Sequence, residues 1–428
     1  MGILLFLIFF VLLLLGTPIA IAIAVPSFLV IWAADLGTAV IAPNFFAGIA
    51  KFPLLAIPLF ILAGFILERC GISQRIIHFA NLLVGRRRGG LAIVAIGVCV
   101  FFGGVSGSGP ADSAAIGAIL IPAMYAQGYS RGYSAALIAA AGSTAIIVPP
   151  SIALIIYGAI TNTSVPALFA AGAIPGFIAG ISLLIPAIWI ARKRGYGSEQ
   201  EGEEEQQTSL WQAFKEAFWG LLAPIIILGG LYGGIFTPTE AAVVAVFYSL
   251  LLGFVIYRTL SLKAGYQILV DASETSAVVM LIVAFAGLFS WAGSTVGILD
   301  DLANMLMGVS TNEWVVLFFI NLLIFVGGML IDAISIFYIF LPIFMPIIEH
   351  FGWDPVWFGV VMTLNLAVGQ FTPPVAVNLY VTTQLANIRL EKTFKAVWPM
   401  VLAMLVALFI VILFPSLSLF IPQFFGLI

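Results

Sequence analysis

The sequence predicts an all-α integral membrane protein built from two inverted-topology repeats. Hydrophobic residues make up 63% of the 428-residue chain and charged residues only 8%, whereas a soluble domain carries roughly 25% charged residues. A set of landmarks also recurs in one order at offsets of 220 to 224 residues. These landmarks are apolar segments broken by glycine or proline, a pattern typical of carriers whose binding site lies between two repeats.

Six pairs of landmarks define the repeat. In chain order they are Pro18 and Pro238, Ala63-Gly64 and Ala286-Gly287, Gly103-Gly104 and Gly327-Gly328, Asp112 and Asp332, Pro122 and Pro342, and Pro149-Pro150 and Pro373-Pro374. Each pair alone is weak evidence, but six pairs in one order are hard to obtain by chance. The predicted organisation is a first repeat over residues 1–191, a linker over 192–210 and a second repeat over 211–428.

Apolar stretches predict about ten membrane spans, because a helix needs roughly 20 apolar residues to cross the hydrocarbon core. The predicted spans are 2–15, 18–34, 52–68, 134–158, 167–191, 211–231, 238–257, 272–296, 356–385 and 394–424. The segment 2–15 lacks the positive n-region of a signal peptide, so we expect it to be retained. The linker is charged and has no apolar anchor, which predicts a flexible, solvated connection.

Two further apolar segments, 91–127 and 315–348, are broken at their centres. The first break is the Gly/Ser-rich run 103–110, and the second lies near Gly327-Gly328 and Asp332. Arms of a dozen or so residues are shorter than the roughly 20 that a crossing needs. Each segment is therefore predicted to be a re-entrant helical hairpin.

The Lys and Arg residues orient the chain, because cytoplasmic loops carry an excess of positive charge. The first hairpin is flanked by Arg86, Arg87, Arg88 and Arg131, so it is predicted to enter from the cytoplasm. Acidic residues alone flank the second hairpin, which is predicted to enter from the periplasm. Alternating the spans makes the linker cytoplasmic and both termini periplasmic, and leaves only Lys51 outside. Hairpins that enter from opposite sides mean inverted repeats.

A double proline interrupts the span after each hairpin, in 134–158 and in 356–385. Proline removes a backbone N–H and clashes with the carbonyl four residues back, so the helix must unwind. Freed carbonyls at membrane depth are tolerated only where they line a cavity or bind something. Carbonyl and hydroxyl oxygens suit Na⁺, and the N-termini of half-helices suit anions.

Each repeat is therefore expected to build one Na⁺ site between its hairpin tip and its broken helix. The first predicted site consists of Ser106, Ser108, Gly142, Val148 and Pro149. The second predicted site consists of Gly327, Asp332, Gly369 and Thr372. Close helix packing is the alternative role for the glycines, but clusters that recur at equal offsets favour sites.

Asp112 and Asp332 are the repeated carboxylates. An ionisable group at membrane depth costs roughly 3 kcal/mol or more and marks a functional site by default. Capping of the returning half-helix is an equally good interpretation, and one residue can do both.

Asp112, Ser151 and Asn378 are the predicted substrate contacts. We expect no cofactor and no metal other than Na⁺, since Cys70 and Cys99 have no metal-ligand spacing. The sequence also has no basic patch for nucleic acid.

An enzymatic reading starts from Gly104-Val105-Ser106-Gly107, which matches the Gly-x-Ser-Gly of rhomboid-type intramembrane serine proteases. Such an enzyme needs a histidine base beside the serine. The sequence contains only His78 and His350, and neither lies on a span that meets Ser106 in this topology. Catalysis is therefore not expected.

Four stretches together carry a family resemblance: 103–124, 148–151, 236–242 and 369–374. They resemble the large membrane subunit, the DctM type or M subunit, of tripartite ATP-independent periplasmic (TRAP) transporters, and the resemblance covers essentially the whole chain. It implies Na⁺-coupled import of an organic anion, such as sialic acid or a C4-dicarboxylate, across a bacterial inner membrane by an elevator mechanism. At Gly109-Pro110 this chain departs from many members of the family.

The resemblance also implies two partners, a small four-helix membrane subunit (Q type) and a periplasmic substrate-binding protein (P type). Aromatic residues of the early spans, Phe6, Phe9, Phe10 and Trp32, are candidate contacts for the small subunit, although lipid contact is the simpler reading for any one of them. A stand-alone inverted-repeat anion/Na⁺ symporter remains the alternative. An adjacent small membrane gene and a secreted binding protein would favour the tripartite system.

Overall fold

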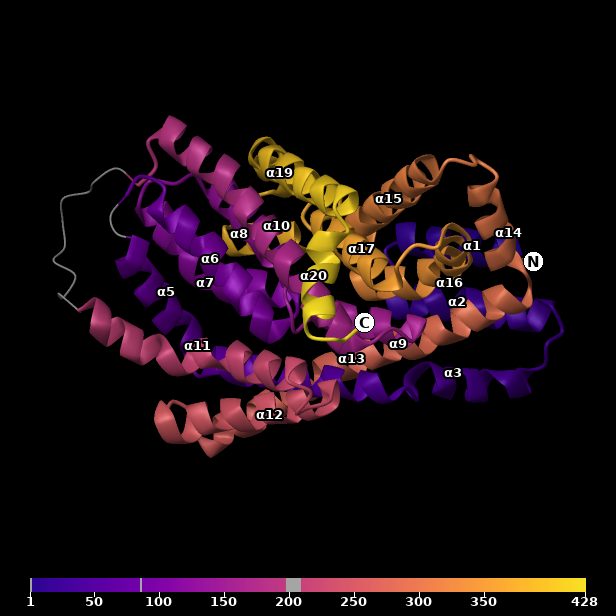
Figure 1. The fold of residues 1–428 in the computed structure, drawn as a ribbon, viewed down its shortest axis with the longest axis horizontal. Helices are drawn as coiled ribbons and strands as arrows, with labels where there is room; N and C mark the ends of the chain where they lie inside the picture. Colours follow the sequence, from indigo (N-terminus) through magenta and orange to yellow (C-terminus); the bar gives the residue numbers. More distant parts are fainter. Residues whose placement is uncertain (1, 85–86, 198–208) are drawn as a thin grey trace.

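The structure, a computed structural model, describes residues 2–84, 87–197 and 209–428, which fold almost entirely into helices (Figure 1). These residues contain no β-strand. Eight helical segments within the described ranges are long and apolar enough to cross a membrane. The chain is therefore a multi-pass membrane protein, and the all-α fold predicted from composition is confirmed.

The described part of the first half contains ten α-helices and three 3₁₀ turns. The α-helices are α1 (Gly2–Leu14), α2 (Ile19–Ala33), α3 (Ile41–Ile49), α4 (Ala56–Arg69), α5 (Ile72–Val84), α6 (Gly90–Ser106), α7 (Gly109–Ala126), α8 (Arg131–Ser143), α9 (Ile152–Thr161) and α10 (Val165–Arg194). The 3₁₀ turns are η1 (Thr38–Val40), η2 (Phe52–Leu55) and η3 (Thr144–Ile146).

The second half contains ten more α-helices. They are α11 (Leu210–Tyr232), α12 (Pro238–Leu251), α13 (Leu262–Thr295), α14 (Ile298–Met307), α15 (Glu313–Leu330), α16 (Ala333–Phe351), α17 (Pro355–Gly369), α18 (Val377–Leu385), α19 (Phe394–Leu413) and α20 (Ser416–Phe424). A π-helical turn, η4 (Leu252–Ile256), extends α12, and a 3₁₀ turn, η5 (Leu390–Thr393), precedes α19. In both halves a short helix, α5 or α14, leads into a helical hairpin, and a broken helix and a long helix follow.

Both predicted hairpins are present, as the helix pairs α6–α7 and α15–α16. Their arms contain 17 and 18 residues in the first hairpin and 18 and 19 in the second, so the expected arm length of a dozen was wrong. In the first hairpin, Gly103 and Gly104 remain helical and the chain reverses only at Gly107, where φ is +62°. Helix α7 forms through Pro110, because a backbone N–H in the first turn of a helix has no hydrogen-bond partner within the helix and proline loses nothing there. Re-entry into a membrane stays a prediction.

Both double prolines interrupt their helices, as predicted. The chain leaves helical structure between η3 and α9, and again between α17 and α18, and each Pro-Pro peptide bond is cis. The two broken helices run antiparallel. The Tyr157 hydroxyl at the end of α9 donates to the Pro355 carbonyl at the start of α17 (2.7 Å). Arg131 at the start of α8 donates to the Ala386 carbonyl after α18 (3.5 Å). Inverted repeats would place the broken helices in this way, and the inverted topology itself stays a prediction.

By their contacts the helices fall into two groups, called here the scaffold body and the hairpin body, which also contact each other where α13 packs against α16 and α4 packs against α6. In the scaffold body (α1–α4 and α11–α13), α13 packs against α2, α3 and α4, and α12 packs against α4. In the hairpin body (α6–α10 and α15–α20), α10 packs against α6, α17, α19 and α20, while α18 packs against α7 and α8. The amphipathic helices α5 and α14, which the sequence analysis did not predict, connect the two bodies.

Three other boundaries differ from the predicted spans. The predicted span 394–424 is two helices, α19 and α20, because Pro415 disfavours helical backbone at the residue before it. The helix predicted at 272–296 begins at Leu262. Within the predicted linker 192–210, α10 continues to Arg194 and α11 begins at Leu210. Residues 198–208 of the linker and Arg86 lie outside the described residues.

The base of the first hairpin lies beside the end of α10. The Gly89 amide donates to the Tyr196 carbonyl (3.3 Å), and the Gly197 amide donates to the Gln127 carbonyl (3.3 Å). These bonds bring the basic residues before α6 close to the basic residues that end α10. This agrees with the rule that Lys and Arg gather on the cytoplasmic side of a membrane protein. Lys51, the exception to this rule, donates to the Ala159 carbonyl (2.8 Å) in the last turn of α9, where a cation is favoured by the helix dipole.

Single cysteines at Arg131 and Glu349 should label from opposite faces of the membrane. Both residues are exposed, one at the start of α8 and the other in the last turn of α16. Both native cysteines are buried, so a Cys70→Ser, Cys99→Ser background should label weakly. In intact spheroplasts an impermeant maleimide should reach position 349 and reach 131 only after lysis. Labelling of both positions from outside would contradict inverted repeats.

Candidate functional site

The tip of the first hairpin holds a serine–carboxylate pair. Ser106 ends α6, and its hydroxyl donates to Oδ1 of Asp112 in the first turn of α7. The Ser108 amide donates to the Ser106 hydroxyl (3.2 Å), while the Ser108 side chain makes no capping bond. The tip therefore concentrates hydroxyl and carboxylate oxygens beside the N-terminus of α7.

This tip packs directly on the first Pro-Pro break. A Cβ atom at Gly103 would lie 2.7 Å from the Ala145 Cα. At Gly104 it would lie 3.1 Å from the Pro149 carbonyl oxygen, and at Gly107 it would lie 2.9 Å from that of Pro150. Real Cβ atoms essentially never come closer than 3.0 Å, so the contact requires glycine at 103 and 107, while a side chain at 104 would require the Pro149 carbonyl to shift. The predicted residues Ser106, Val148 and Pro149 thus meet at one junction.

Gly142, the remaining predicted member of the first site, belongs to the contact between α7 and α8. A Cβ atom there would overlap the side chain of Ser113 on α7. Its position is therefore explained by close packing, the alternative role considered for the glycines. A carbonyl contribution from Gly142 to a cation site stays a prediction.

The second hairpin forms an equivalent junction with its own broken helix. A Cβ atom at Gly369 would lie 2.7 Å from the Gly328 Cα, and the Ala376 amide donates to the Met329 carbonyl (3.2 Å). The Gly369 carbonyl accepts the Thr372 amide (3.0 Å), and the Thr372 hydroxyl donates to the Val368 carbonyl (2.6 Å). A carbonyl oxygen has two lone pairs, so Gly369 and Val368 each retain one acceptor site.

Gly327 lies on the other side of its helix from this junction. Its Cα faces α16, where an added Cβ would lie 3.3 Å from the Ile336 side chain. Its carbonyl accepts the Ile331 amide (2.9 Å) at the tip. Gly328, which belongs to a repeat landmark but not to the predicted site, is the glycine that contacts the broken helix.

The two repeated carboxylates have different surroundings. Asp332 is the N-cap of α16, where its carboxylate accepts the amides of Ile334 (2.9 Å) and Ser335 (3.2 Å) and the Ser335 hydroxyl (2.6 Å). Asp112 accepts the Ser106 hydroxyl, and its Oδ2 is buried without a partner among the described residues. The capping interpretation therefore describes Asp332, while Asp112 keeps a free oxygen. The difference arises because α7 begins at Gly109-Pro110, which places Asp112 inside the first turn.

A cavity of about 220 Å³ lies between the two tips. Residues 105–112 of the first tip and 332–334 of the second line it, together with Gln370 from the second break. The scaffold body contributes Ile61, Gly64, Phe65 and Glu68 from α4 and Thr275 and Val279 from α13. Helices α7 and α16 begin at this cavity, and the N-termini of helices favour anions.

The charges that line the cavity are all negative. Asp112, Asp332 and Glu68 belong to its wall, and no Lys or Arg does among the described residues. An organic anion would meet repulsion here unless cations were bound with it. The cavity thus offers hard oxygen ligands for a cation and the N-terminus of α7 for an anion, since Asp332 already accepts the first amides of α16.

Of the three predicted substrate contacts, only Asp112 lines this cavity. The Ser151 hydroxyl is the N-cap of α9, accepting the Leu154 amide (3.3 Å) and donating to the Ile146 carbonyl. The Asn378 amide group is buried behind the first tip, close to Gly109, and donates to the Ala139 carbonyl (3.3 Å). Direct substrate contact by these two residues stays a prediction.

Sequence reasoning missed Glu68, Thr275 and Gln370. Gln370 lies inside the repeated break motif, where a lone amide among apolar residues was the available signal. Glu68 is an ionisable residue at the end of an apolar span, which is unusual enough to suggest function. Nothing in the sequence around Thr275 indicates that it faces the cavity.

A family model matches residues 6–417; its description is "Tripartite ATP-independent periplasmic transporter, DctM component". The isethionate TRAP transporter permease protein DctMQ of Oleidesulfovibrio alaskensis is 39% identical over 97% of this chain, which spans 64% of that relative's length. The sialic acid TRAP transporter large permease protein SiaM of Vibrio cholerae is 38% identical over 90% of this chain and 89% of its own. The C4-dicarboxylate TRAP transporter large permease protein DctM of Pseudomonas aeruginosa is 37% identical over 88% of this chain and 87% of its own.

Among solved structures, the crystal structure of the Alcanivorax borkumensis YdaH transporter shares the fold. Its TM-score is 0.64 at 14% sequence identity, and the match covers 88% of this chain and 87% of that one.

Proposed function

The chain belongs to the DctM component family of TRAP transporters, and we propose that it imports an organic anion with Na⁺ as the coupling ion. Members of this family are transporters and not enzymes, so the serine hydrolase alternative is excluded. The observation that carries the proposal is the cavity between the hairpin tips, which combines carboxylates and the N-terminus of α7 and has no basic side chain along its described wall.

This electrostatic arrangement supports Na⁺ coupling. A buried carboxylate such as Asp112 costs roughly 3 kcal/mol or more at membrane depth unless it is paired. Bound Na⁺ would neutralise it, and the same positive charge would attract the anionic substrate. The proposed cation sites are the two tip–break junctions, with Ser106, Asp112 and the Pro149 carbonyl at the first and the carbonyls of Val368 and Gly369 at the second.

A small acid is the favoured substrate. The cavity of about 220 Å³ is below the range of about 300–1,000 Å³ that is usual for drug-sized ligands. The names of the relatives include isethionate, C4-dicarboxylates and sialic acid. Of these, isethionate and C4-dicarboxylates fit this volume better than the nine-carbon sialic acid does.

The proposed transport movement is a slide of the hairpin body along the scaffold body. The sites lie in the hairpin body, and α4 and α13 of the scaffold body close the cavity on one side. Helix α10 packs with the hairpin body and would move with it. We place the protein in a bacterial inner membrane, with both termini in the periplasm.

The proposed partners are a small membrane subunit and a periplasmic binding protein. The surface suggested for the small subunit requires a correction: Phe9 is fully buried and packs against Phe289, and Phe6 also contacts Phe289. Trp32 is 76% exposed, Phe10 is 39% exposed and Phe6 is partly exposed, so only Phe9 of the four is unavailable to a partner.

Uptake should depend on both partners. The chain is purified alone and with a co-expressed small subunit, reconstituted into proteoliposomes, and supplied with a binding protein and labelled isethionate, succinate and sialic acid. Strong uptake of one of the smaller acids is expected only from the complex. Full uptake by this chain alone would contradict the tripartite assignment and favour the stand-alone symporter.

A further inference from the structure

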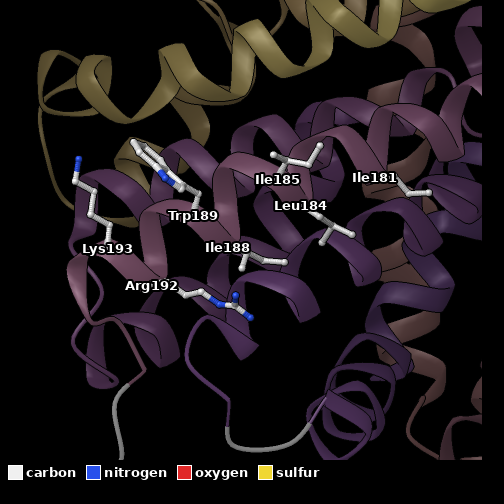
Figure 2. A pocket seen from close by; sticks show the side chains of 7 residues that line it. All are labelled: Ile181, Leu184, Ile185, Ile188, Trp189, Arg192 and Lys193. Carbon is white, nitrogen blue, oxygen red and sulfur yellow. The ribbon is translucent and has the colours of Figure 1, made fainter.

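Helix α10 has an exposed apolar face that ends in two basic residues (Figure 2). Two rows of side chains at four-residue spacing form this face, and side chains so spaced are neighbours on a helix. One row consists of Ile181, Ile185, Trp189 and Lys193, and the other of Leu184, Ile188 and Arg192. Ile185 is 71% exposed and Trp189 is 59% exposed, so the face is open to the membrane.

Helix α19 converts part of this face into a groove. Between α10 and α19 lies an open hollow of about 620 Å³, with Pro186 on one wall and Leu402 and Val406 on the other. It shares Ile181, Ile185 and Trp189 with a second hollow of about 790 Å³ that runs along α10 to Arg192 and Lys193. The two hollows adjoin along this shared row and are together called the groove; α10 and α19 wall one part, and residues of α10 alone line the part that reaches the basic end.

The basic end is exposed. The Lys193 Nζ lies 4.8 Å from the centre of the Trp189 ring, a cation–π contact that holds it at the mouth of the groove. Arg194 donates instead to the Tyr196 hydroxyl (3.2 Å), at the base of the first hairpin. Lys395 lies one turn before the groove residue Pro399, so it belongs to the same end. No acidic residue lines either hollow among the described residues.

Two general rules already explain positive charge at this end. Cytoplasmic segments are rich in Lys and Arg, and the dipole of α10 favours cations at its C-terminus. That explanation does not require a concave apolar surface leading to the charges. A long apolar groove with a cationic mouth is complementary to a phospholipid, whose acyl chains are apolar and whose phosphate is anionic. Tryptophan at the mouth suits the headgroup level of a bilayer.

We infer that the groove between α10 and α19 binds one anionic phospholipid from the leaflet at the Arg192–Lys193 end. Its acyl chains lie along Ile185, Leu402 and Val406, and its phosphate lies at Lys193 beside Trp189, with Arg192 adding positive charge on the neighbouring face of α10. Because α10 and α19 belong to the hairpin body, the lipid is bound to that body and away from the scaffold body. The inference is independent of the substrate and of the coupling ion.

Native mass spectrometry of the purified chain, titrated with dioleoyl phosphatidylglycerol, tests the inference. The Arg192→Gln, Lys193→Gln variant should bind this lipid about tenfold more weakly. The control variant Arg258→Gln, Lys263→Gln, which removes two basic residues from the scaffold body, should bind as the natural chain does. Dioleoyl phosphatidylcholine should bind weakly to all three. Equal losses in the two variants would mean nonspecific attraction and would overturn the inference.

A second pair of variants tests the groove itself without a change of charge. Ala403→Phe fills the α19 wall of the groove and should also reduce phosphatidylglycerol binding about tenfold. Ala277→Phe adds the same bulk to an exposed position on α13 and should have no effect. Undiminished binding in Ala403→Phe would overturn the inference. So would undiminished binding in the Arg192→Gln, Lys193→Gln variant.

Discussion

Asp112→Asn should reduce Na⁺-driven uptake about a hundredfold or more. The substitution keeps the size of the side chain and removes the charge that is proposed to hold Na⁺ beside Ser106. Loss of one partner from a buried charged pair costs about 3–5 kcal/mol, and about 1.4 kcal/mol corresponds to a factor of ten. Initial uptake rates over a range of Na⁺ concentrations measure the effect, and size-exclusion profiles verify that the variant is folded.

Asp332→Asn is the matched control, because it changes the equivalent carboxylate of the second repeat. Asparagine is as good an N-cap as aspartate, so α16 should keep its cap and uptake should fall only a few-fold. The comparison separates the two roles that the sequence left open for these residues. Equal loss in both variants would make Asp332 a cation ligand as well as a cap. Unchanged uptake in Asp112→Asn would remove Asp112 from the site.

Gly369→Ala should reduce uptake strongly while the protein remains folded. The added methyl group would lie 2.6 Å from the Gly328 carbonyl carbon, a backbone atom that cannot rotate away. Overpacking of this kind costs about 1–3 kcal/mol. The cost falls on the junction that is proposed to bind the second Na⁺, so we expect a loss of about tenfold to a hundredfold in uptake.

Gly229→Ala is the control for this substitution. Gly229 lies within α11, and an added Cβ there has no atom within 4 Å. Alanine is a better helix former than glycine by about 1 kcal/mol, so expression and uptake should be unchanged. If Gly369→Ala transported as well as Gly229→Ala, the tight contact between hairpin and broken helix would have no part in transport.

Local chemistry made the hairpins and the broken helices predictable. Proline cannot continue a helix interior, and Gly107 permits the left-handed backbone at the first tip. Arm lengths were not predictable, because Gly103 and Gly104 remain helical for a tertiary reason, their contact with the first break. The burial of Phe9 against Phe289 is also a contact between distant segments of the chain, so the sequence could not reveal it.

The site was only partly predictable from the sequence. The motifs located the tips and breaks, which the structure brings together within each repeat. The roles of Asp112 and Asp332 depend on where each helix begins, a difference of a few residues that the repeat pattern conceals. Glu68 and Thr275 reach the cavity because α4 and α13 pack against the hairpin body, and such long-range packing leaves no local signal.

Coupling to Na⁺ is the central claim, and one uptake measurement tests it most directly. The chain, its small subunit and a binding protein are reconstituted into proteoliposomes, and uptake of the preferred acid is compared under an inward Na⁺ gradient and under a proton gradient alone. Uptake in the Na⁺ gradient should be far higher, and it should vanish in Na⁺-free buffer. Equal uptake with and without Na⁺ would contradict the claim.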